Sequence, residues 1–595
     1  MTSVTRSDDR LRRINLREGL LYALLPMLIA VATSIRSLPG VIAGGLVDPD
    51  SYMRVIRLEA ALGHHDLGYV VARDGSGAGT LLHWSHLLDF LLCLLAAPLR
   101  LVLDTHAALH AAAAAFGPLS MAALGIGVAW AAAPLAERRW LWLAPAVVAL
   151  SPAIVSYGLP GVGHHHVLLV LCAVMTCGYA VRGALRPSPA RAGLAMGAWA
   201  GVGIWLSPES MPFSLMAFGG LWLAWLSMPE RRDIARMIRM TGIGFLAVVT
   251  GGFAVDPPYA GYASIEIDRI SVVYLFLAFA VCMTGCAAAA LDRLQLHGRW
   301  RIVACLAIPA VYLAVWLGLF PAVIRGPGGL MNAHDTHVFL DGIAEMMPVR
   351  SLSGAIEFLM TGTLTAIVLT AICVSRRSLL LGYVAVCACV LIALGATHVR
   401  FAAYMAAAAA VMLPVLITGC TEYLASWAEG AQAAARVGLI ALFVLLPRAE
   451  RLPVFSSSAN AATNETAPTC SLSDSGAMLA DHAGQVVLAD PNDSPELLYR
   501  TRVLTVGSLY HRNVAAFMRL RAAWRSPPSD VVPEAVRNTG ASLVLFCHSL
   551  GRSLLVADLP PETLLDRLNR GEVPPWLSKI DEDPQSGNTL YQVTR

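Results

Sequence analysis

Residues 376–401, RRSLLLGYVAVCACVLIALGATHVRF, decide the fold class of this chain. The run 378–396 within this stretch contains no charged residue. A helix needs about 20 apolar residues to cross the hydrocarbon core of a bilayer, which is about 30 Å thick. Basic residues flank the run on both sides, as Arg376 and Arg377 before it and Arg400 after it. The pattern predicts a transmembrane helix.

Runs of the same kind fill the first 447 residues. They lie near 20–37, 107–132, 140–157, 166–182, 191–206, 211–228, 238–255, 271–291, 302–321, 353–374, 378–396, 401–419 and 433–447. The chain is 56% hydrophobic and 14% charged, with a mean hydropathy of +0.62, which excludes an ordinary soluble domain. A net charge of +3 gives no reason to expect a nucleic-acid partner. We predict a polytopic α-helical membrane protein with about 13 transmembrane helices.

The apolar run 87–103 is interpreted differently. His86 precedes it, Asp89 and Pro98 interrupt it, and Arg100 lies near its end. A span here would also reverse the side on which all later basic loops fall. We therefore expect an interfacial or re-entrant segment.

Arginines in the connecting segments predict the orientation. The basic loops hold Arg10, Arg12, Arg13, Arg17, Arg138, Arg139, Arg182, Arg186, Arg191, Arg231, Arg232, Arg236, Arg239, Arg293, Arg299, Arg301, Arg376 and Arg377. With thirteen spans they all fall on one side, which the positive-inside rule makes cytoplasmic. The N-terminus is then cytoplasmic and the C-terminal region periplasmic. Arginine and alanine bias favours a GC-rich bacterial genome, so we expect a bacterial inner membrane.

Composition also predicts the domain boundaries. We expect a membrane domain over 1–447 with long outer loops at 38–106 and 322–352, a linker rich in small polar residues over 448–470, and a periplasmic domain over 471–595. Short apolar runs at 486–488, 503–506 and 543–546 predict strands, and the segments 495–501 and 513–524 predict helices. The tail is therefore expected to be a small α/β domain. Cys470 and Cys547 would be able to form a disulfide if this domain is periplasmic.

Two carboxylates stand in the first outer loop, in Asp48-Pro49-Asp50-Ser51. Carboxylate oxygens suit hard divalent cations such as Mg²⁺ and Mn²⁺. A structural alternative is that Asp48 caps a helix that begins near Pro49, because Asp before Pro favours a helix N-terminus. The two roles are compatible.

Three consecutive histidines, His164, His165 and His166, follow two glycines near the outer face. We expect them to open a helix. On a helix, three consecutive side chains cannot face one way, so at most one or two would be metal ligands. An interfacial polar cap is the alternative.

Further candidates lie in later outer segments. Glu209 stands where one predicted span ends and the next begins, and Glu345 lies in the loop 322–352 together with His337. The density of polar residues in that loop suits a mobile substrate-binding lid. Arg400, with Tyr404 one turn later, is expected on the outer side, where a phosphate would be a natural partner for a guanidinium.

These residues, in this order, resemble the catalytic subunit of oligosaccharyltransferase and its single-chain bacterial and archaeal relatives, which belong to the C-type glycosyltransferase superfamily (GT-C fold). The resemblance covers nearly the whole chain. Asp48-Pro49 followed by Tyr52 and Arg54 is similar to the first acidic motif of that family, and Pro160 through His166 is similar to the second.

The resemblance implies roles for individual residues. Asp48, Asp50 and Glu345 would be catalytic, and the metal, Mn²⁺ or Mg²⁺, would be held by Asp48, His164, His166 and Glu345. Arg400 and Tyr404 would bind the donor phosphate, and Tyr52, Arg54, Glu209 and His337 would contact substrate.

The implied activity is transfer of a sugar or oligosaccharide from a polyprenyl phosphate or pyrophosphate to a glycan, lipid or protein acceptor on the periplasmic side. Two features depart from the family. His164 stands where an aspartate is usual, and the tail has no Trp-Trp-Asp motif, which reads the acceptor sequon in the family. A transporter or flippase of lipid-linked glycans and a non-catalytic glycolipid-binding protein are the alternative hypotheses.

Overall fold

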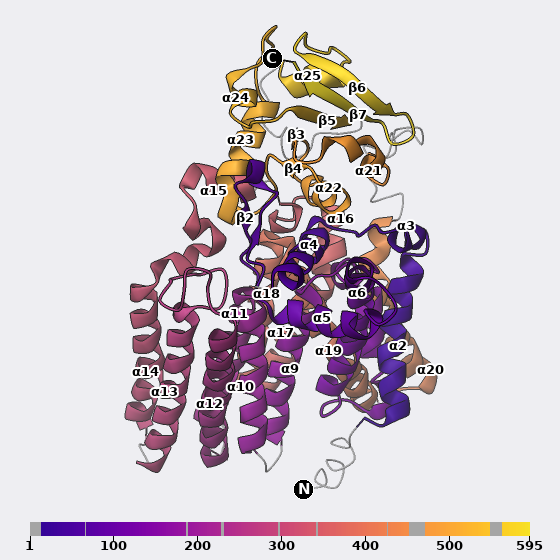
Figure 1. Ribbon diagram of the computed structural model, residues 1–595. Helices are drawn as coiled ribbons and strands as arrows, with labels where there is room; N and C mark the ends of the chain where they lie inside the picture. Colours follow the sequence, from indigo (N-terminus) through magenta and orange to yellow (C-terminus); the bar gives the residue numbers. More distant parts are fainter. Residues whose placement is uncertain are drawn as a thin grey trace.

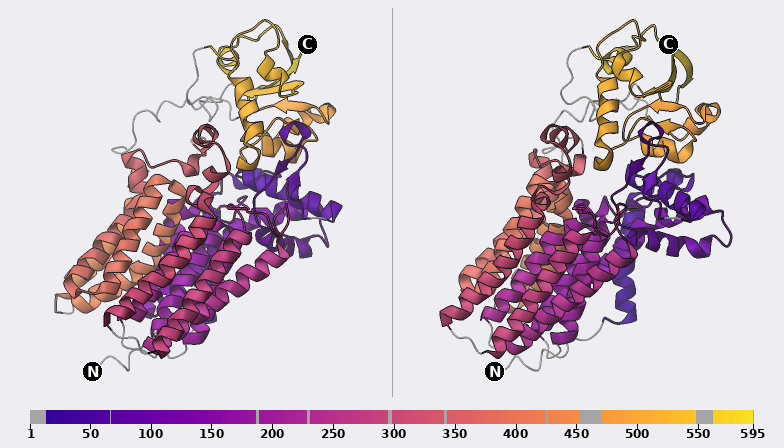
Figure 2. Two further views of the ribbon diagram at one scale, coloured as in Figure 1. Left: turned by 90° about the vertical axis from the view of Figure 1, so that its left-hand side faces the viewer. Right: turned by 60° about the vertical axis from the view of Figure 1, so that its left-hand side comes forward.

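A computed structural model of the chain describes residues 14–65, 67–185, 189–227, 231–294, 298–340, 343–424, 426–451, 470–547 and 562–594. Long helices form a bundle, and an α/β domain built by the last part of the chain lies against one end of it (Figure 1). Two further views show the same arrangement (Figure 2). Most of the predicted linker 448–470 lies outside the described residues.

The bundle contains the helices that the apolar runs predict. They are α2 (Leu16–Thr33), α6 (Thr105–Ala132), α9 (His166–Leu185), α10 (Pro189–Leu206), α11 (Met211–Ser227), α12 (Arg231–Val255), α13 (Val272–Arg293), α14 (Gly298–Leu319), α17 (Met360–Arg376), α18 (Leu379–Thr397), α19 (Ala402–Tyr423) and α20 (Glu429–Val444). Among the described residues, eleven helical stretches are long and apolar enough to cross a membrane. The prediction of a multi-pass α-helical membrane protein is therefore confirmed.

Two of the thirteen predicted spans do not meet that criterion. The helix α10 is present, but its first turns contain Arg191. The run 140–157 is broken into α7 (Leu143–Leu150) and α8 (Pro152–Val155), with Ser151 extended between them. A residue before proline is pushed out of the α region, which explains the break at Ser151-Pro152.

The first outer segment is a folded structure rather than an open loop. It contains α3 (Leu38–Ile42), α4 (Pro49–His64), β1 (Val70–Val71), β2 (Thr80–Leu81) and α5 (Leu87–Leu99), and β1 pairs with β2 in antiparallel fashion. The helix α5 has 13 residues. At 1.5 Å per residue it is about 20 Å long, too short to span a bilayer core of about 30 Å.

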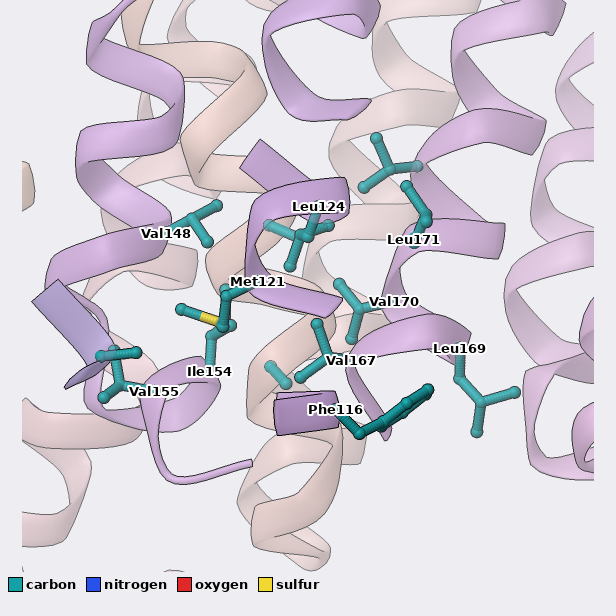
Figure 3. Packing of buried hydrophobic residues seen from close by; sticks show 14 of the residues in the cluster. Phe116, Met121, Leu124, Val148, Ile154, Val155, Val167, Leu169, Val170 and Leu171 are labelled. Carbon is teal, nitrogen blue, oxygen red and sulfur yellow. The ribbon is translucent and has the colours of Figure 1, made fainter. Parts of the chain in front are cut away.

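The bundle core is densely packed where α6, α7, α8 and α9 meet. Figure 3 shows Leu124 of α6 beside Val170 of α9, and Met121 of α6 beside Ile154 of α8. This rigid packing supports the segment between α8 and α9, in which the three histidines lie.

The C-terminal domain has the predicted α/β fold. Its sheet has the order β4-β3-β5-β7-β6, formed by β3 (Val486–Leu488), β4 (Leu504–Thr505), β5 (Leu543–Cys547), β6 (Leu577–Asp583) and β7 (Asn588–Val593). Strands β3, β4 and β5 run parallel, and β6 and β7 add an antiparallel hairpin. The helices are α21 (Ser475–Met478), α22 (Ser494–Arg500), α23 (Val514–Trp524), α24 (Glu534–Arg537) and α25 (Leu564–Asn569). The predicted Cys470–Cys547 disulfide is present.

Buried polar contacts fix this domain to the first outer segment. Asp74, fully buried, accepts hydrogen bonds from the hydroxyls of Thr80 (2.7 Å), Thr505 (2.8 Å) and Ser508. Arg73 donates to backbone carbonyls of the same domain, including that of Thr501 at 2.7 Å. Residues of the C-terminal domain are thereby held next to the start of α4.

Candidate active site

Asp48 is the N-cap of α4, as predicted. Its carboxylate accepts hydrogen bonds from the backbone N–H of Ser51 at 2.8 Å and from the Ser51 hydroxyl at 2.7 Å. The same hydroxyl oxygen accepts a bond from the N–H of Gly163 at 2.8 Å. Ser51 therefore ties the aspartate loop to the turn before the histidines. Burial raises the pKa of Asp48.

Asp50 links three distant parts of the chain. One carboxylate oxygen lies 2.8 Å from Nε2 of His164, and the other accepts a hydrogen bond of 2.9 Å from the hydroxyl of Tyr510 in the C-terminal domain. Burial acts to raise the pKa of Asp50, but the hydrogen bonds from His164 and Tyr510 and the charges of His164 and Arg54 together outweigh burial and lower the pKa. Burial acts to lower the pKa of His164, but Asp50 and Asp48 raise it to about 9. The pair is therefore held as a carboxylate and an imidazolium.

The three histidines lie together, which differs from the prediction. Only His166 belongs to helix α9, and His164 and His165 precede it. Because the backbone is not helical there, the constraint on consecutive helical side chains does not apply. Ligand nitrogens of all three residues lie within 4.8 Å of one another, and the rings of His164 and His166 stack at 4.3 Å between centroids.

Glu209, Glu345 and Arg400 form a second cluster beside His166. One terminal nitrogen of Arg400 lies 2.9 Å from Glu209, 3.2 Å from Glu345 and 2.9 Å from Nε2 of His166. The carboxylates lie 3.9 Å (Glu209) and 3.7 Å (Glu345) from that imidazole nitrogen. The other terminal nitrogen of Arg400 faces the sulfur of Met346 at 3.0 Å, and the buried Nε has no hydrogen-bond acceptor.

Tyr157 belongs to this cluster, although the sequence reasoning missed it. Its ring stacks on His166 at 4.5 Å with an interplanar angle of 7°, and its hydroxyl donates to Glu345 at 3.1 Å. Its only signal in the sequence is an aromatic residue at the end of an apolar run, which is common at membrane interfaces.

Four other candidates lie in different surroundings. Arg54 is buried and pairs with Asp89 at 2.7 Å, and the hydroxyl of Tyr52 accepts a bond from the N–H of Leu46. Tyr404 is buried one turn after Arg400. Its ring stacks on Phe213 at 3.6 Å. His337 is exposed on α15 (Ala333–Leu340), within the second outer segment. Arg54 and Tyr52 therefore hold the site together and do not face it.

The donor set favours a cation that accepts imidazole. His164, His165 and His166 are the cluster of ligand atoms that could hold a metal here, and neither Asp48 nor Glu345 belongs to it. Both oxygens of Asp48 are engaged by Ser51. Imidazole nitrogen suits Mn²⁺, Zn²⁺ and similar ions better than Mg²⁺, which prefers oxygen. The residues present therefore fit a transition metal.

Several solved structures of an archaeal oligosaccharyltransferase are similar to this chain. One is AglB from Archaeoglobus fulgidus in complex with an inhibitory peptide and a dolichol-phosphate, with a TM-score of 0.66, 12% sequence identity, and 97% of this chain and 74% of that chain covered. A second is the enzyme of the same organism in complex with Zn and sulfate, with a TM-score of 0.65, 13% identity, and 96% and 73% coverage.

A third structure is the same organism's enzyme tethered to an acceptor peptide containing the NVT sequon, with a TM-score of 0.64, 13% identity, and 98% and 74% coverage. No family model matches this chain, and no curated protein matches it. At this level of identity the likeness concerns the fold. The chain shares its overall fold with these oligosaccharyltransferase structures, and its own C-terminal domain contains a five-stranded sheet.

Proposed function

We propose that this protein is a membrane glycosyltransferase that moves a sugar or oligosaccharide from a polyprenyl phosphate or pyrophosphate to an acceptor. One observation carries the proposal: Asp50, His164, His166 and Arg400 form a continuous chain of contacts at the end of the bundle that bears the C-terminal domain. Carboxylates, imidazoles and a guanidinium at one membrane surface match the needs of a lipid-phosphate leaving group and a protic acceptor.

Arg400 is the proposed site for the donor phosphate. Glu209 and Glu345 neutralise one terminal nitrogen, whereas Nε has no acceptor and the other terminal nitrogen meets only a sulfur atom. A guanidinium presents several donors in a planar fork that matches phosphate oxygens. A donor phosphate would satisfy the donors that the protein leaves unused, with Tyr404 supporting the turn from which Arg400 projects.

The proposed reaction is a single displacement. The acceptor nucleophile attacks the anomeric carbon, the bond from that carbon to the phosphate oxygen breaks, and the lipid phosphate leaves with the electron pair, so the configuration inverts. The proton of the acceptor passes to a carboxylate of the Asp48–Asp50 pair. Glu345 closes the site from the loop side through Tyr157 and Arg400. Glu209 holds the guanidinium in place.

A divalent metal is part of the proposal. His164 and His166 would hold it, and His164 would first have to give its proton to Asp50. Asp48 would join only after release from Ser51, and Glu345 only after release from Arg400. When bound, such an ion supplies positive charge that stabilises a phosphate leaving group and orients the acceptor.

The acceptor is proposed to be a glycan, a lipid or a protein segment without a glycosylation sequon. One structural neighbour carries an acceptor peptide with the NVT sequon, but this chain has no Trp-Trp-Asp motif. The C-terminal domain instead presents Tyr510 to Asp50. We further propose a bacterial inner membrane, with the active site and residues 471–595 on the periplasmic side, because the arginine-rich loops then lie in the cytoplasm.

The test is transfer of radiolabel from a pool of polyprenyl-linked sugars to endogenous acceptors in reconstituted membranes, with Mn²⁺, Zn²⁺ or Mg²⁺ and with chelator. Asp50→Asn and Arg400→Gln should each reduce transfer at least about 100-fold, whereas the exposed Glu572→Gln should not change it. Transfer that persists in both variants would contradict the site. Absence of transfer in wild type, with movement of donor lipid across the bilayer, would favour a flippase.

A further inference from the structure

A second cluster of metal-ligand residues lies beside the proposed active site. His83 follows β2, Asp268 lies between α12 and α13, and His511 begins a short 3₁₀ turn in the C-terminal domain. One ligand atom from each lies within 4.8 Å of the others. Three segments separated by hundreds of residues thus bring two imidazoles and one carboxylate to one point.

His83 has an unsatisfied nitrogen at this point. Its Nδ1 is buried and has no hydrogen-bond partner. Its ring lies 4.3 Å from that of His511, tilted by 53°. A buried imidazole nitrogen without a hydrogen-bond partner is a group that a bound metal ion would satisfy.

Asp268 is oriented by groups around the cluster. One carboxylate oxygen lies 2.7 Å from Nε2 of His511 and 2.7 Å from Nε of Arg512, and Arg512 also reaches Glu266 at 2.6 Å. Glu266 also lies 3.9 Å from Nε of Arg269, so two guanidinium groups and two carboxylates surround the cluster. Hydrogen bonds from a neighbouring side chain to a ligating carboxylate are the usual support of a metal ligand.

We propose that His83, Asp268 and His511 bind a transition-metal ion of the Zn²⁺ type, which fastens the C-terminal domain to the two outer segments. Two imidazoles and one carboxylate, with a fourth position for water, are a zinc ligand set. The hard ions Mg²⁺ and Ca²⁺ are disfavoured, because only one of the three ligands is an oxygen.

An ion bound at this cluster would also affect the proposed active site, because His511 follows Tyr510 in the chain. Tyr510 and Asn513 flank the turn that begins at His511. Tyr510 donates to Asp50, and Asn513 donates to the hydroxyl of Thr80 at 2.7 Å. An ion bound at His511 would therefore fix the residue that holds Asp50. The binding itself does not depend on the proposed transfer activity.

The test is zinc stoichiometry of the full-length protein in detergent, after removal of metals with chelator and dialysis against a low concentration of Zn²⁺. To separate the two clusters, the measurement uses the double variant His164→Ala, His166→Ala as background. We expect this background to bind about one equivalent of Zn²⁺. Adding His83→Ala should abolish that equivalent at the same free Zn²⁺ concentration, because the affinity falls at least about tenfold. The exposed His334→Ala should leave it unchanged.

His83→Ala leaves the Arg512–Asp268 pair in place, so the metal-free variant should unfold at the temperature of its background, and this is checked first. If that temperature falls, His83→Gln, which keeps a polar side chain of similar size, replaces it in the same assay. Cobalt substitution supplies an independent readout, because tetrahedral Co²⁺ with nitrogen ligands absorbs in the visible. Zinc retained at full stoichiometry after loss of His83, or no zinc in the background, would overturn the proposal.

Discussion

The two long outer segments of this protein are built in opposite ways. The first, residues 34–104, is fixed by buried charges: Asp89 pairs with Arg54 at 2.7 Å and with Arg57, all three being nearly inaccessible. In the segment 320–351 the proposed site residue is Glu345, whose side chain is 30% exposed while it contacts Arg400 and Tyr157. The difference teaches that one half of the proposed site is built from buried charges and the other half is attached through a partly exposed carboxylate.

The contacts of the second segment are concentrated around Glu345. Tyr157 and Arg400 bind its carboxylate, and the N–H of Val349 donates to the carbonyl of Ala396 at 2.9 Å. A segment held through partly exposed contacts opens at a lower free energy than one held by buried contacts. The expected substrate-binding lid is consistent with this construction and stays a prediction.

Breaking the buried charges should have the largest effect. Asp89→Ala leaves Arg54 and Arg57 as two buried guanidinium groups without their carboxylate, which should lower the free energy of unfolding by about 3–5 kcal/mol. Thermal unfolding in detergent measures the loss. The matched control is Glu572→Ala, which removes an exposed partner of Arg570 and should cost less than about 1 kcal/mol. Equal effects would contradict the comparison.

The second largest loss of stability should come from breaking the attachment of the C-terminal domain. Asp74→Ala removes the acceptor of three hydroxyls, two of them in the C-terminal domain. Hydrogen bonds to a charged group contribute about 1.5–3 kcal/mol, so we expect a loss of about 2–3 kcal/mol. Limited proteolysis should then release the domain faster. Asp335→Ala, in the other outer segment, is the control and should leave the rate unchanged.

Glu345→Gln should separate activity from stability. The side chain of Glu345 is 30% exposed and Glu209 still neutralises Arg400, so the free energy of unfolding should change by less than about 1 kcal/mol. If the proposed function holds, transfer should fall about 100-fold, because the closing contact is lost. A large fall in unfolding temperature would show instead that this segment is as firmly built as the first.

Tyr510→Phe should have the smallest effect. It removes the hydroxyl that donates to Asp50 and keeps the ring against Trp84, whose centroid lies 5.4 Å away. Loss of one such bond is expected to cost about 1 kcal/mol, which is a fivefold to tenfold fall in transfer. Tyr510→Ala, which also removes the ring, should reduce stability as well. Identical behaviour of the two variants would mean that the hydrogen bond contributes nothing.

The fold was largely predictable because hydropathy reports it directly. Apolar runs predicted the helices, and the cap by Asp48 and the Cys470–Cys547 disulfide are confirmed. The hairpin β6–β7 was missed, because β6 is an edge strand with exposed charged residues and no alternating apolar pattern.

The site was less predictable because its contacts join distant residues. In the sequence, Asp89 was recognised only as a charged residue that interrupts an apolar run. Its partners, Arg57 and Arg54, lie 32 and 35 residues earlier. The gathering of His164 with His165 and His166 depends on a backbone that is not helical, which the sequence did not indicate. The cluster of His83 with Asp268 and His511 joins segments that no local pattern relates.

The bond between Asp74 and Thr505 spans 431 residues, which sets the order in which the protein is completed during synthesis. At about 5–20 residues per second, the first outer segment waits roughly 20–90 s for its partner to leave the ribosome. Until then, of the three described hydroxyls that donate to the Asp74 carboxylate, the Thr80 hydroxyl alone has been made. The amino end of the protein thus acquires its final shape only when the carboxyl end arrives, and a prematurely terminated chain would hold a membrane bundle without a finished outer surface.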